Sequence, residues 1–204
     1  MSALRRELRN KALSVIAEKI SAGVPLSEAD ALTMLTTNDV LELGILADSV
    51  KTGLHGDTVY YGVNMNLNYT NVCELRCPLC AFSCSEGDTP SYTLSLEEIE
   101  GRVRQAAFSG IDEVHIVGGL NPRLSLDYFE DMLRRIKKID PKLFIVAFTA
   151  VEYDYFSRIN SIPLEEVFLK LKEAGLGALP GGGAEIFSER IREVIAPKLS
   201  LIHI

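Results

Sequence analysis

The 204-residue chain lacks several features that would place it in a class of protein at once. It has 21 lysines and arginines against 28 aspartates and glutamates, so it lacks the basic excess of nucleic-acid-binding proteins. No apolar run approaches the roughly 18 residues that a bilayer-spanning helix needs. The N-terminal residues contain no apolar stretch of the kind that marks a secretory signal peptide. We therefore expect a cytoplasmic protein that binds neither nucleic acid nor membranes.

Cysteine is absent from most of the chain, because all four cysteines lie within the twelve positions from Cys73 to Cys84. Packing alone would scatter cysteines through the apolar segments, so this clustering indicates a metal site, and thiolates select zinc, copper(I) or iron–sulfur clusters. Structural zinc normally needs a second pair of ligands, and the histidines are distant in sequence, at His55, His115 and His203. Disulfides would require an oxidising compartment. An iron–sulfur cluster is the favoured interpretation.

The spacing leaves open how many thiolates hold the cluster. Cys73, Cys77 and Cys80 form a C-x3-C-x2-C pattern, and Cys84 follows in a polar loop. Three thiolates leave one iron with an open coordination position, which is the difference between catalytic and structural metal sites. With Cys84 as a fourth ligand the cluster would be closed and suited to electron transfer.

The order of predicted elements indicates an α/β fold. Residues 1–56 are predicted to form an N-terminal helical extension, with helix starts near Ser27 and Asn38. Residues 57–197 alternate between strands and helices, as parallel βα units do. The predicted strands are 58–68, 112–119, 142–148 and 176–179, and the predicted helices are 95–110, 125–138, 163–174 and 184–195. Four units cannot close a barrel, so we expect a partial (β/α) TIM-type barrel, a tail at 198–204, and a fragment of a larger protein.

The segments that follow the predicted strands carry the remaining unusual residues, where α/β barrels bind ligands. Gly118 and Gly119 would let a ligand approach the backbone. Thr149 and Glu152 follow the third strand, in a segment predicted as a loop. The triglycine segment 180–183 is predicted to open a helix that suits a carboxylate or phosphate, although no Gly-Lys-Ser/Thr of a P-loop is present. His115 alternates with apolar neighbours, and a satisfied core histidine is the favoured interpretation.

Several of these runs resemble a known family. The cysteine spacing is similar to the signature loop of the radical S-adenosylmethionine (SAM) superfamily. Segments 68–73, 115–122, 147–152 and 174–187 resemble the aminofutalosine synthases of the futalosine route to menaquinone, and the resemblance extends through Pro197. It implies that Cys73, Cys77 and Cys80 bind three irons of a [4Fe–4S] cluster, while SAM chelates the fourth iron.

The resemblance also implies which residues meet SAM. Gly118 and Gly119 would contact its methionine part, and Thr149 and Glu152 could reach its ribose. Leu79 stands where the superfamily often has an aromatic residue, and Leu120 stands where it often has a glutamate. We expect Phe82 to supply the aromatic contact instead.

The reaction implied by the resemblance is addition of the 5′-deoxyadenosyl radical to 3-[(1-carboxyvinyl)oxy]benzoate, a dicarboxylate aryl enol ether, to give aminofutalosine. An external one-electron reductant of the flavodoxin or ferredoxin type would drive it. Two alternatives remain. One is a related radical SAM enzyme, either a cyclic dehypoxanthinyl futalosine synthase or an FO synthase subunit. The other is a non-catalytic iron–sulfur electron carrier.

Overall fold

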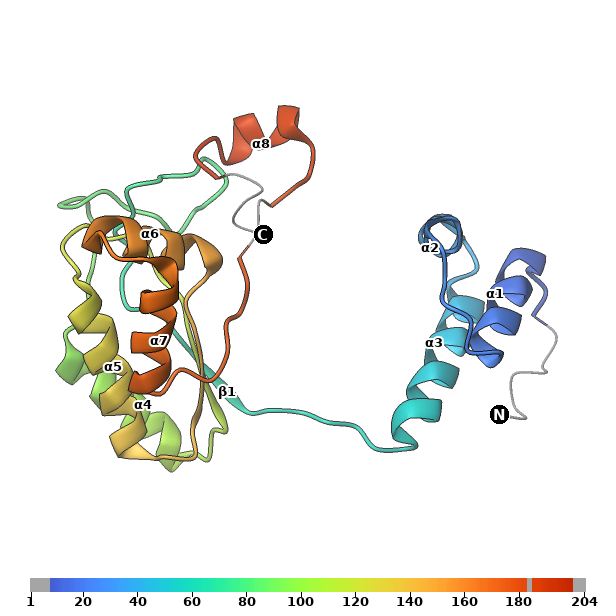
Figure 1. Cartoon of the computed structure of the whole chain (residues 1–204), viewed down its shortest axis with the longest axis horizontal. Coiled ribbons are helices and arrows are strands. Elements are labelled where there is room, and N and C mark those ends of the chain that lie inside the picture. Colours follow the sequence, from blue (N-terminus) through green and yellow to red (C-terminus); the bar gives the residue numbers. More distant parts are fainter. Residues whose placement is uncertain (1–7, 183–184, 200–204) are drawn as a thin grey trace. The chain divides into compact units, whose positions relative to one another are not determined.

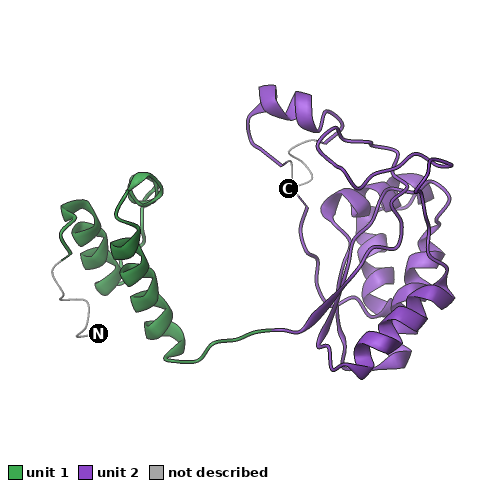
Figure 2. Ribbon diagram, turned by 180° about the vertical axis from the view of Figure 1, so that it is seen from behind, with its two compact units in different colours: residues 1–61 green, residues 62–204 purple. Residues whose placement is uncertain are grey.

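The computed structural model describes residues 8–182 and 185–199. The chain divides into two compact units, residues 1–61 and residues 62–204 (Figure 2). An exposed segment that includes Val59, Tyr60 and Tyr61 precedes the first strand of the second unit. In the described residues no helix has the length and apolar character needed to cross a membrane.

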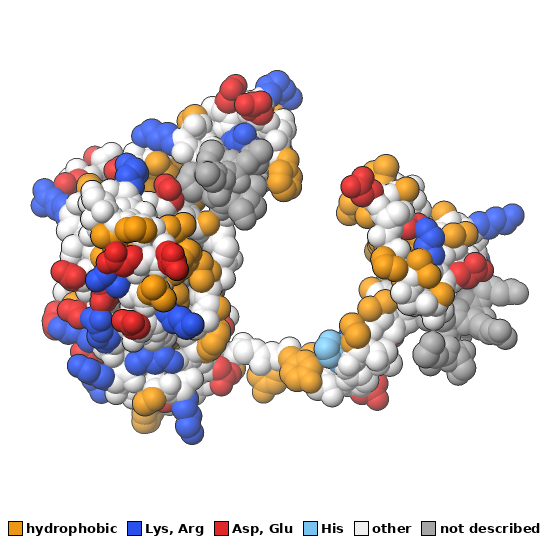
Figure 3. Space-filling view, viewed as in Figure 1, with side chains coloured by type: hydrophobic (Ala, Val, Ile, Leu, Met, Phe, Trp, Pro, Cys, Tyr) orange, Lys and Arg blue, Asp and Glu red, His pale blue; other side chains and the backbone are white. Residues whose placement is uncertain are grey.

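The first unit consists of three helices, α1 (Lys11–Ser21), α2 (Glu28–Thr36) and α3 (Val40–His55). Ser27 and Asp30 form a capping box at the start of α2, so the predicted helix start at Ser27 is confirmed. Asp39 is the N-cap of α3 in place of the predicted Asn38. The buried core of this unit is small and consists of Leu13, Ile16, Ala17 and Leu46. Figure 3 shows hydrophobic side chains on its surface.

The second unit is built on three short parallel strands, β1 (Asn64–Leu67), β2 (Glu113–Ile116) and β3 (Phe144–Ala147), in the order β1-β2-β3. At their carboxyl ends Leu67 pairs with Ile116, and Ile116 pairs with Ala147. All three strands therefore end at the same level, which brings together the loops that follow them. The predicted first strand, residues 58–68, is too long, because β1 begins at Asn64 and only Val63 of the preceding residues bonds to the start of β2, through Asp112 and Glu113.

Five helices accompany the strands: α4 (Leu96–Phe108), α5 (Leu126–Ile139), α6 (Ala150–Asn160), α7 (Leu164–Ala174) and α8 (Glu189–Ile195) (Figure 1). The predicted helices 95–110, 125–138 and 163–174 are confirmed as α4, α5 and α7. Ser95 and Glu98 form the predicted capping box of α4. Gly175 ends α7 in the left-handed conformation that favours glycine.

The two faces of the sheet differ in what covers them. Val114, Ile116 and Ile145 are fully buried and pack in the main core with residues of α4, α5 and α7. Figure 2 shows the helices on one side of the strands. The alternation of a strand turns Asn66 and His115 to the opposite face, where the side chain of His115 is 31% exposed. The interpretation of His115 as a core histidine is therefore wrong.

Two predicted elements are corrected at the C-terminal end. The predicted strand 176–179 pairs with β3 through a single parallel bridge between Ala178 and Val146, so the described sheet has three strands. Pro180 follows at once and has no N–H to continue the pairing. The predicted helix 184–195 starts at a residue outside the described ranges, and the observed helix α8 begins only at Glu189. Glu185 has a positive φ of 64°, which is incompatible with a right-handed helix there.

A third correction concerns residues 149–154, which were predicted as a loop. They form the start of α6, because the side chain of Thr149 accepts a hydrogen bond from the Glu152 N–H and Glu152 bonds back to the Thr149 N–H. This capping box fixes the first turn of the helix directly after β3. As a result Thr149 and Glu152 lie at the carboxyl end of the sheet.

Candidate functional site

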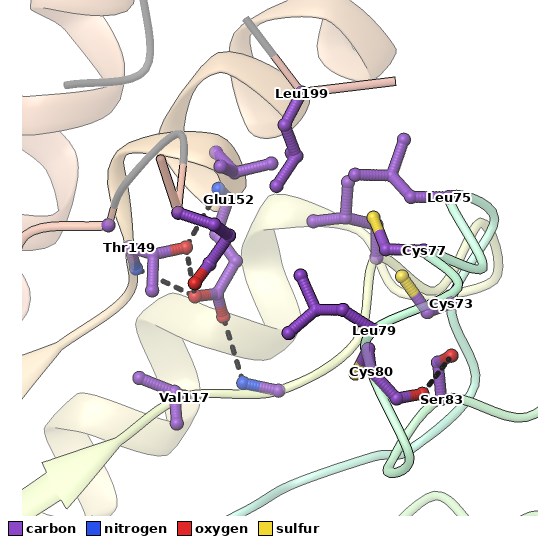
Figure 4. A pocket seen from close by; sticks show the side chains of 15 residues that line it. Cys73, Leu75, Cys77, Leu79, Cys80, Ser83, Val117, Thr149, Glu152 and Leu199 are labelled. Atoms are coloured by element: carbon purple, nitrogen blue, oxygen red, sulfur yellow. Dashed lines mark hydrogen bonds between the residues drawn. The ribbon is translucent and has the colours of Figure 1, made fainter. Parts of the chain in front are cut away.

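A cavity of about 340 Å³ lies where the segments after β1, β2 and β3 meet. Figure 4 shows the cysteine loop on one side of this cavity and Thr149 and Glu152 on the opposite side. The lining includes six residues predicted for the site: Cys73, Cys77, Cys80, Gly118, Thr149 and Glu152. The structure thus brings three thiols and three residues from two other strand ends to one place.

The cysteine loop is held by its own backbone and by the segment after β2. The Cys73 N–H donates to the Cys84 carbonyl at 3.1 Å, and the Glu74 N–H donates to the Leu120 carbonyl at 3.1 Å. Inside the loop the Cys80 N–H donates to the Cys77 carbonyl at 2.9 Å, which closes a tight turn. These hydrogen bonds hold the backbone that carries the three thiols in place.

The thiols suit a cluster better than a single ion. Burial, followed by the nearby Cys73 and Cys80, raises the pKa of the Cys77 thiol, so the three groups influence one another. Among the described residues no trio of His, Cys, Asp or Glu side chains converges closely enough for one metal ion. A [4Fe–4S] cluster takes one thiolate on each of several irons, so its ligands surround a volume and do not meet at a point. Three cysteines around one cavity fit that requirement.

Cys84 occupies a different environment from the other three cysteines. Its Sγ accepts a hydrogen bond from the Asn71 side-chain amide at 3.4 Å, and its N–H donates to the Asn71 carbonyl at 2.8 Å. Asn71 is itself buried and also bonds to Pro90 and Tyr92. Cys84 does not line the cavity. Its carbonyl accepts the hydrogen bond from the Cys73 N–H, so Cys84 holds the cysteine loop through its backbone. This geometry disfavours the closed four-cysteine cluster.

Gly118 and Gly119 are required by the packing of the chain on itself. A Cβ on Gly118 would lie 2.6 Å from the Tyr69 ring, and a Cβ on Gly119 would lie 2.2 Å from the Val72 carbonyl oxygen. Neither distance is tolerated, so only glycine lets the end of β2 lie against the cysteine loop. Gly118 lines the cavity, whereas Gly119 does not.

Glu152 connects the ends of all three strands. Its Oε1 accepts hydrogen bonds from the Tyr69 hydroxyl, after β1, at 2.7 Å and from the Gly118 N–H, after β2, at 3.1 Å. Its Oε2 accepts from the Thr149 N–H at 2.6 Å and from the Thr149 hydroxyl at 2.8 Å, after β3. Figure 4 shows the bonds to Thr149 and to the backbone of the β2 end. The carboxyl group thus fixes the geometry of the cavity wall.

The environment of Glu152 changes its acidity. Its side chain is 1% exposed, and burial raises its pKa from 4.5 to about 7 even though its four hydrogen bonds act in the opposite direction. No described lysine or arginine forms an ion pair with it. Burial and the neighbouring Glu152 also raise the pKa of Tyr69.

Phe82 does not lie where the aromatic contact was expected. It is 41% exposed, and its ring meets Tyr92 edge-on at 6.3 Å between centroids. Leu79 lines the cavity, and Phe82 does not. The cavity therefore gives no support to a contact between Phe82 and SAM.

Sequence reasoning missed Tyr69, which is fully buried and donates to Glu152. It also missed why Thr149 and Glu152 lie together. The signal was present, since Thr149-Ala-Val-Glu152 is the Ser/Thr-x-x-Glu pattern of a capping box. In the described residues no helix begins directly after the triglycine segment as expected, because α8 begins at Glu189. Gly182 and Glu185 nevertheless line the cavity.

The family described as the radical SAM superfamily matches residues 67–201. Aminodeoxyfutalosine synthase of Thermus thermophilus is 37% identical over 94% of this chain, which covers 51% of that protein. A 5-amino-6-(D-ribitylamino)uracil–L-tyrosine 4-hydroxyphenyl transferase of Microcystis aeruginosa is 35% identical over 90% of the chain, and 50% of that protein is covered. The chain spans about half the length of the curated relatives it matches.

The fold comparison agrees with the predicted architecture. The crystal structure of methylornithine synthase matches 92% of the chain with a TM-score of 0.70, at 18% sequence identity and over 52% of its own length. At this identity the match concerns the fold alone. Together with the parallel sheet, it confirms the predicted α/β partial barrel.

Proposed function

The chain belongs to the radical SAM superfamily, and we propose that it carries the cluster- and cofactor-binding part of an aminofutalosine synthase. Members of this superfamily use a [4Fe–4S] cluster and SAM. One observation carries the proposal: Cys73, Cys77 and Cys80 line a single cavity whose opposite wall is formed by Gly118, Thr149 and Glu152. The wall and the thiols come from the carboxyl ends of three neighbouring strands.

The roles of the residues follow from their positions. Cys73, Cys77 and Cys80 are proposed to hold three irons and to leave one iron free for the amino and carboxylate groups of SAM. Gly118 and Thr149 offer backbone and hydroxyl groups on the other wall, and Glu152 holds both in place. When bound, the cluster and SAM supply the 5′-deoxyadenosyl radical. Gly119 and Phe82 lie outside the lining and have no part in this assignment.

The substrate proposed is 3-[(1-carboxyvinyl)oxy]benzoate, with a flavodoxin- or ferredoxin-type protein as the one-electron donor. The likeness to the Thermus thermophilus enzyme supports this choice. Among the described residues, no lysine or arginine lines the cavity. The two carboxylates of the substrate are therefore proposed to be bound outside this lining, by groups that the relatives supply in the other half of their length.

The cofactor proposal is tested by loading the purified chain with iron and sulfide under argon, reducing it with dithionite, and recording electron paramagnetic resonance spectra with and without SAM. We expect a [4Fe–4S] signal that changes on addition of SAM, followed by formation of 5′-deoxyadenosine. A cluster whose spectrum does not respond to SAM would favour the electron-carrier alternative instead.

The substrate proposal is tested with a chimera that joins residues 1–197 to the remaining part of the Thermus thermophilus synthase. We expect aminofutalosine from 3-[(1-carboxyvinyl)oxy]benzoate. The same chimera is offered tyrosine with 5-amino-6-(D-ribitylamino)uracil, the compounds named for the Microcystis aeruginosa relative. Product from that pair alone would replace the proposed substrate.

A further inference from the structure

The cavity has an unusual charge distribution. Glu152 and Glu185 are its only charged lining residues in the described part of the chain. Glu185 is exposed and therefore screened by solvent, whereas Glu152 is buried in the wall. Lys198 donates to the Glu74 carbonyl at 2.9 Å, and Arg158 pairs with the Glu74 carboxylate at 2.8 Å. Neither of them, and no other described lysine or arginine, forms an ion pair with Glu152.

The hydrogen bonds of Glu152 partly offset the effect of burial, which disfavours its ionised form. Two of its four partners are the backbone N–H groups of Gly118 and Thr149, which can only donate, and each faces a different carboxyl oxygen. A neutral carboxylic acid would have to turn its own O–H toward one of these sides. Four donors around one carboxyl group stabilise the anion, so that Glu152 is ionised above its pKa of about 7 although burial opposes the charge.

We propose that the buried carboxylate of Glu152 selects a positively charged ligand in the cavity, and so makes the site prefer the sulfonium of SAM over the neutral thioether of S-adenosylhomocysteine. This inference rests on the proposed function and assigns Glu152 a role beyond contact with the ribose. Its oxygens are already occupied by Tyr69, Gly118 and Thr149, so Glu152 acts through its charge and as a positioning residue. A charge in a poorly solvated wall interacts with a cation more strongly than one in water does.

The same charge has a consequence for release. Cleavage of SAM by one electron from the external donor would remove the positive charge, because neither methionine nor the 5′-deoxyadenosyl group that adds to the substrate carries a sulfonium. The cavity wall then loses its favourable electrostatic interaction with the bound molecules. Glu152 therefore favours binding of the intact cofactor over retention of its fragments.

The test compares the affinities of the reconstituted chain for SAM and S-adenosylhomocysteine by calorimetry at about pH 8, which is above the pKa of about 7 of Glu152. We expect Glu152→Gln to weaken SAM binding on the order of tenfold or more and to leave S-adenosylhomocysteine binding nearly unchanged. Glu98→Gln serves as the control, because it removes the acid of the matching but exposed capping box of α4. It should keep the wild-type ratio of affinities.

A second measurement covers the case in which Glu152→Gln does not fold, as judged by circular dichroism. The unaltered chain is titrated with sinefungin, which carries an ammonium group in place of the sulfonium. We expect sinefungin to bind more tightly than S-adenosylhomocysteine. Equal binding of these two ligands, or a parallel loss of both affinities in Glu152→Gln, overturns the inference. If the unaltered chain binds neither SAM nor the two analogues, it is the proposed function that fails.

Discussion

Cys73, Cys77 and Cys80 differ from Cys84 in what surrounds them, although all four lie in one short segment. The first three line the cavity, whereas the Cys84 thiol faces the Asn71 amide. We expect alanine at any of the first three positions to reduce bound iron from about four atoms per chain to background. Cys84→Ala should retain the cluster, because it removes only one weak hydrogen bond. Iron and sulfide assays after reconstitution measure both outcomes.

This prediction separates the open cluster from the closed one. A four-cysteine cluster would lose iron in all four variants. It would also show no change in its spectrum when SAM is added to the unaltered chain. Retention of the cluster in Cys84→Ala together with a response to SAM is compatible only with three protein ligands.

Glu152 makes stability depend on pH in an uncommon direction for a carboxyl group. Its pKa is about 7 in the folded chain against 4.5 as its ordinary value, so the folded state holds the proton more tightly. Its contribution to stability is therefore complete below about pH 4.5 and is lost as the pH rises through about 7. The difference corresponds to roughly 3 kcal/mol, since each pKa unit is worth about 1.4 kcal/mol.

The measurement is urea denaturation of the unaltered chain and of Glu152→Gln between about pH 5 and pH 8. We expect the unaltered chain to lose stability relative to the variant across this interval. Glu98→Gln is the control, because Glu98 belongs to the same kind of capping box but is exposed. Parallel profiles for the unaltered chain and Glu152→Gln would contradict the effect of burial on Glu152.

At the scale of elements, the prediction succeeded where a local signal determines the structure. The helices α4, α5 and α7 have apolar periodicity and clear end signals, such as Ser95 with Glu98 and Gly175. The cysteine spacing also located one wall of the site. These features depend on residues that are neighbours in sequence, so the sequence alone is sufficient to predict the helices and the cysteine loop.

One error, the loop predicted at residues 149–154, overlooked the local capping-box pattern of Thr149 and Glu152. The other errors come from features that depend on distant segments. The extended segment 58–63 and the segment 176–179 have strand-like sequences, but strand length is set by the neighbouring strand, and each lacks enough of a partner. The role of Tyr69 could not be predicted, because its hydroxyl meets a carboxylate 83 residues away in sequence. Glu152 was selected for its place after a strand, and its four donors became evident only from the packing.

The junction between β2 and the cysteine loop gives a prediction about elements. Gly119→Ala should destabilise the second unit by at least about 1–3 kcal/mol, because its Cβ would overlap the Val72 carbonyl at 2.2 Å. Gly101→Ala is the matched control, since Gly101 is inside α4 with no atom within 4 Å of the added Cβ. It should stabilise the helix by about 0.5–1 kcal/mol. Thermal unfolding followed by circular dichroism measures both changes. If Gly119→Ala were as stable as Gly101→Ala, the packing argument would be refuted.

At the scale of the whole molecule, the described residues of the second unit cover one face of the sheet and leave the other face exposed. Asn66 and His115 lie on the uncovered face, which in a closed barrel would point to the interior. The chain spans about half the length of its curated relatives, 51% in the case of the Thermus thermophilus synthase. The cavity proposed for the cofactor is formed by three strand ends within this chain. Binding of the cofactor and binding of the substrate are therefore expected to be separable.

This separation leads to a prediction about the chain by itself. A cavity lined by carboxylates and by no described lysine or arginine cannot stabilise a substrate with two carboxylates. We expect the reconstituted and reduced chain of 204 residues to cleave SAM to 5′-deoxyadenosine at the same rate with and without 3-[(1-carboxyvinyl)oxy]benzoate. Aminofutalosine should stay below detection, whereas the chimera with the second half of the Thermus thermophilus synthase should form it.

Liquid chromatography with mass spectrometry quantifies 5′-deoxyadenosine and aminofutalosine in the same samples. The control is the Cys77→Ala variant of the chain, which should form neither compound because it lacks one cluster ligand. Aminofutalosine from the 204-residue chain alone would contradict the prediction, because donors for both carboxylates would then have to lie within it. His115 and Asn66 would be the first residues to replace, since both are polar, lie on the exposed sheet face and can donate hydrogen bonds to a carboxylate.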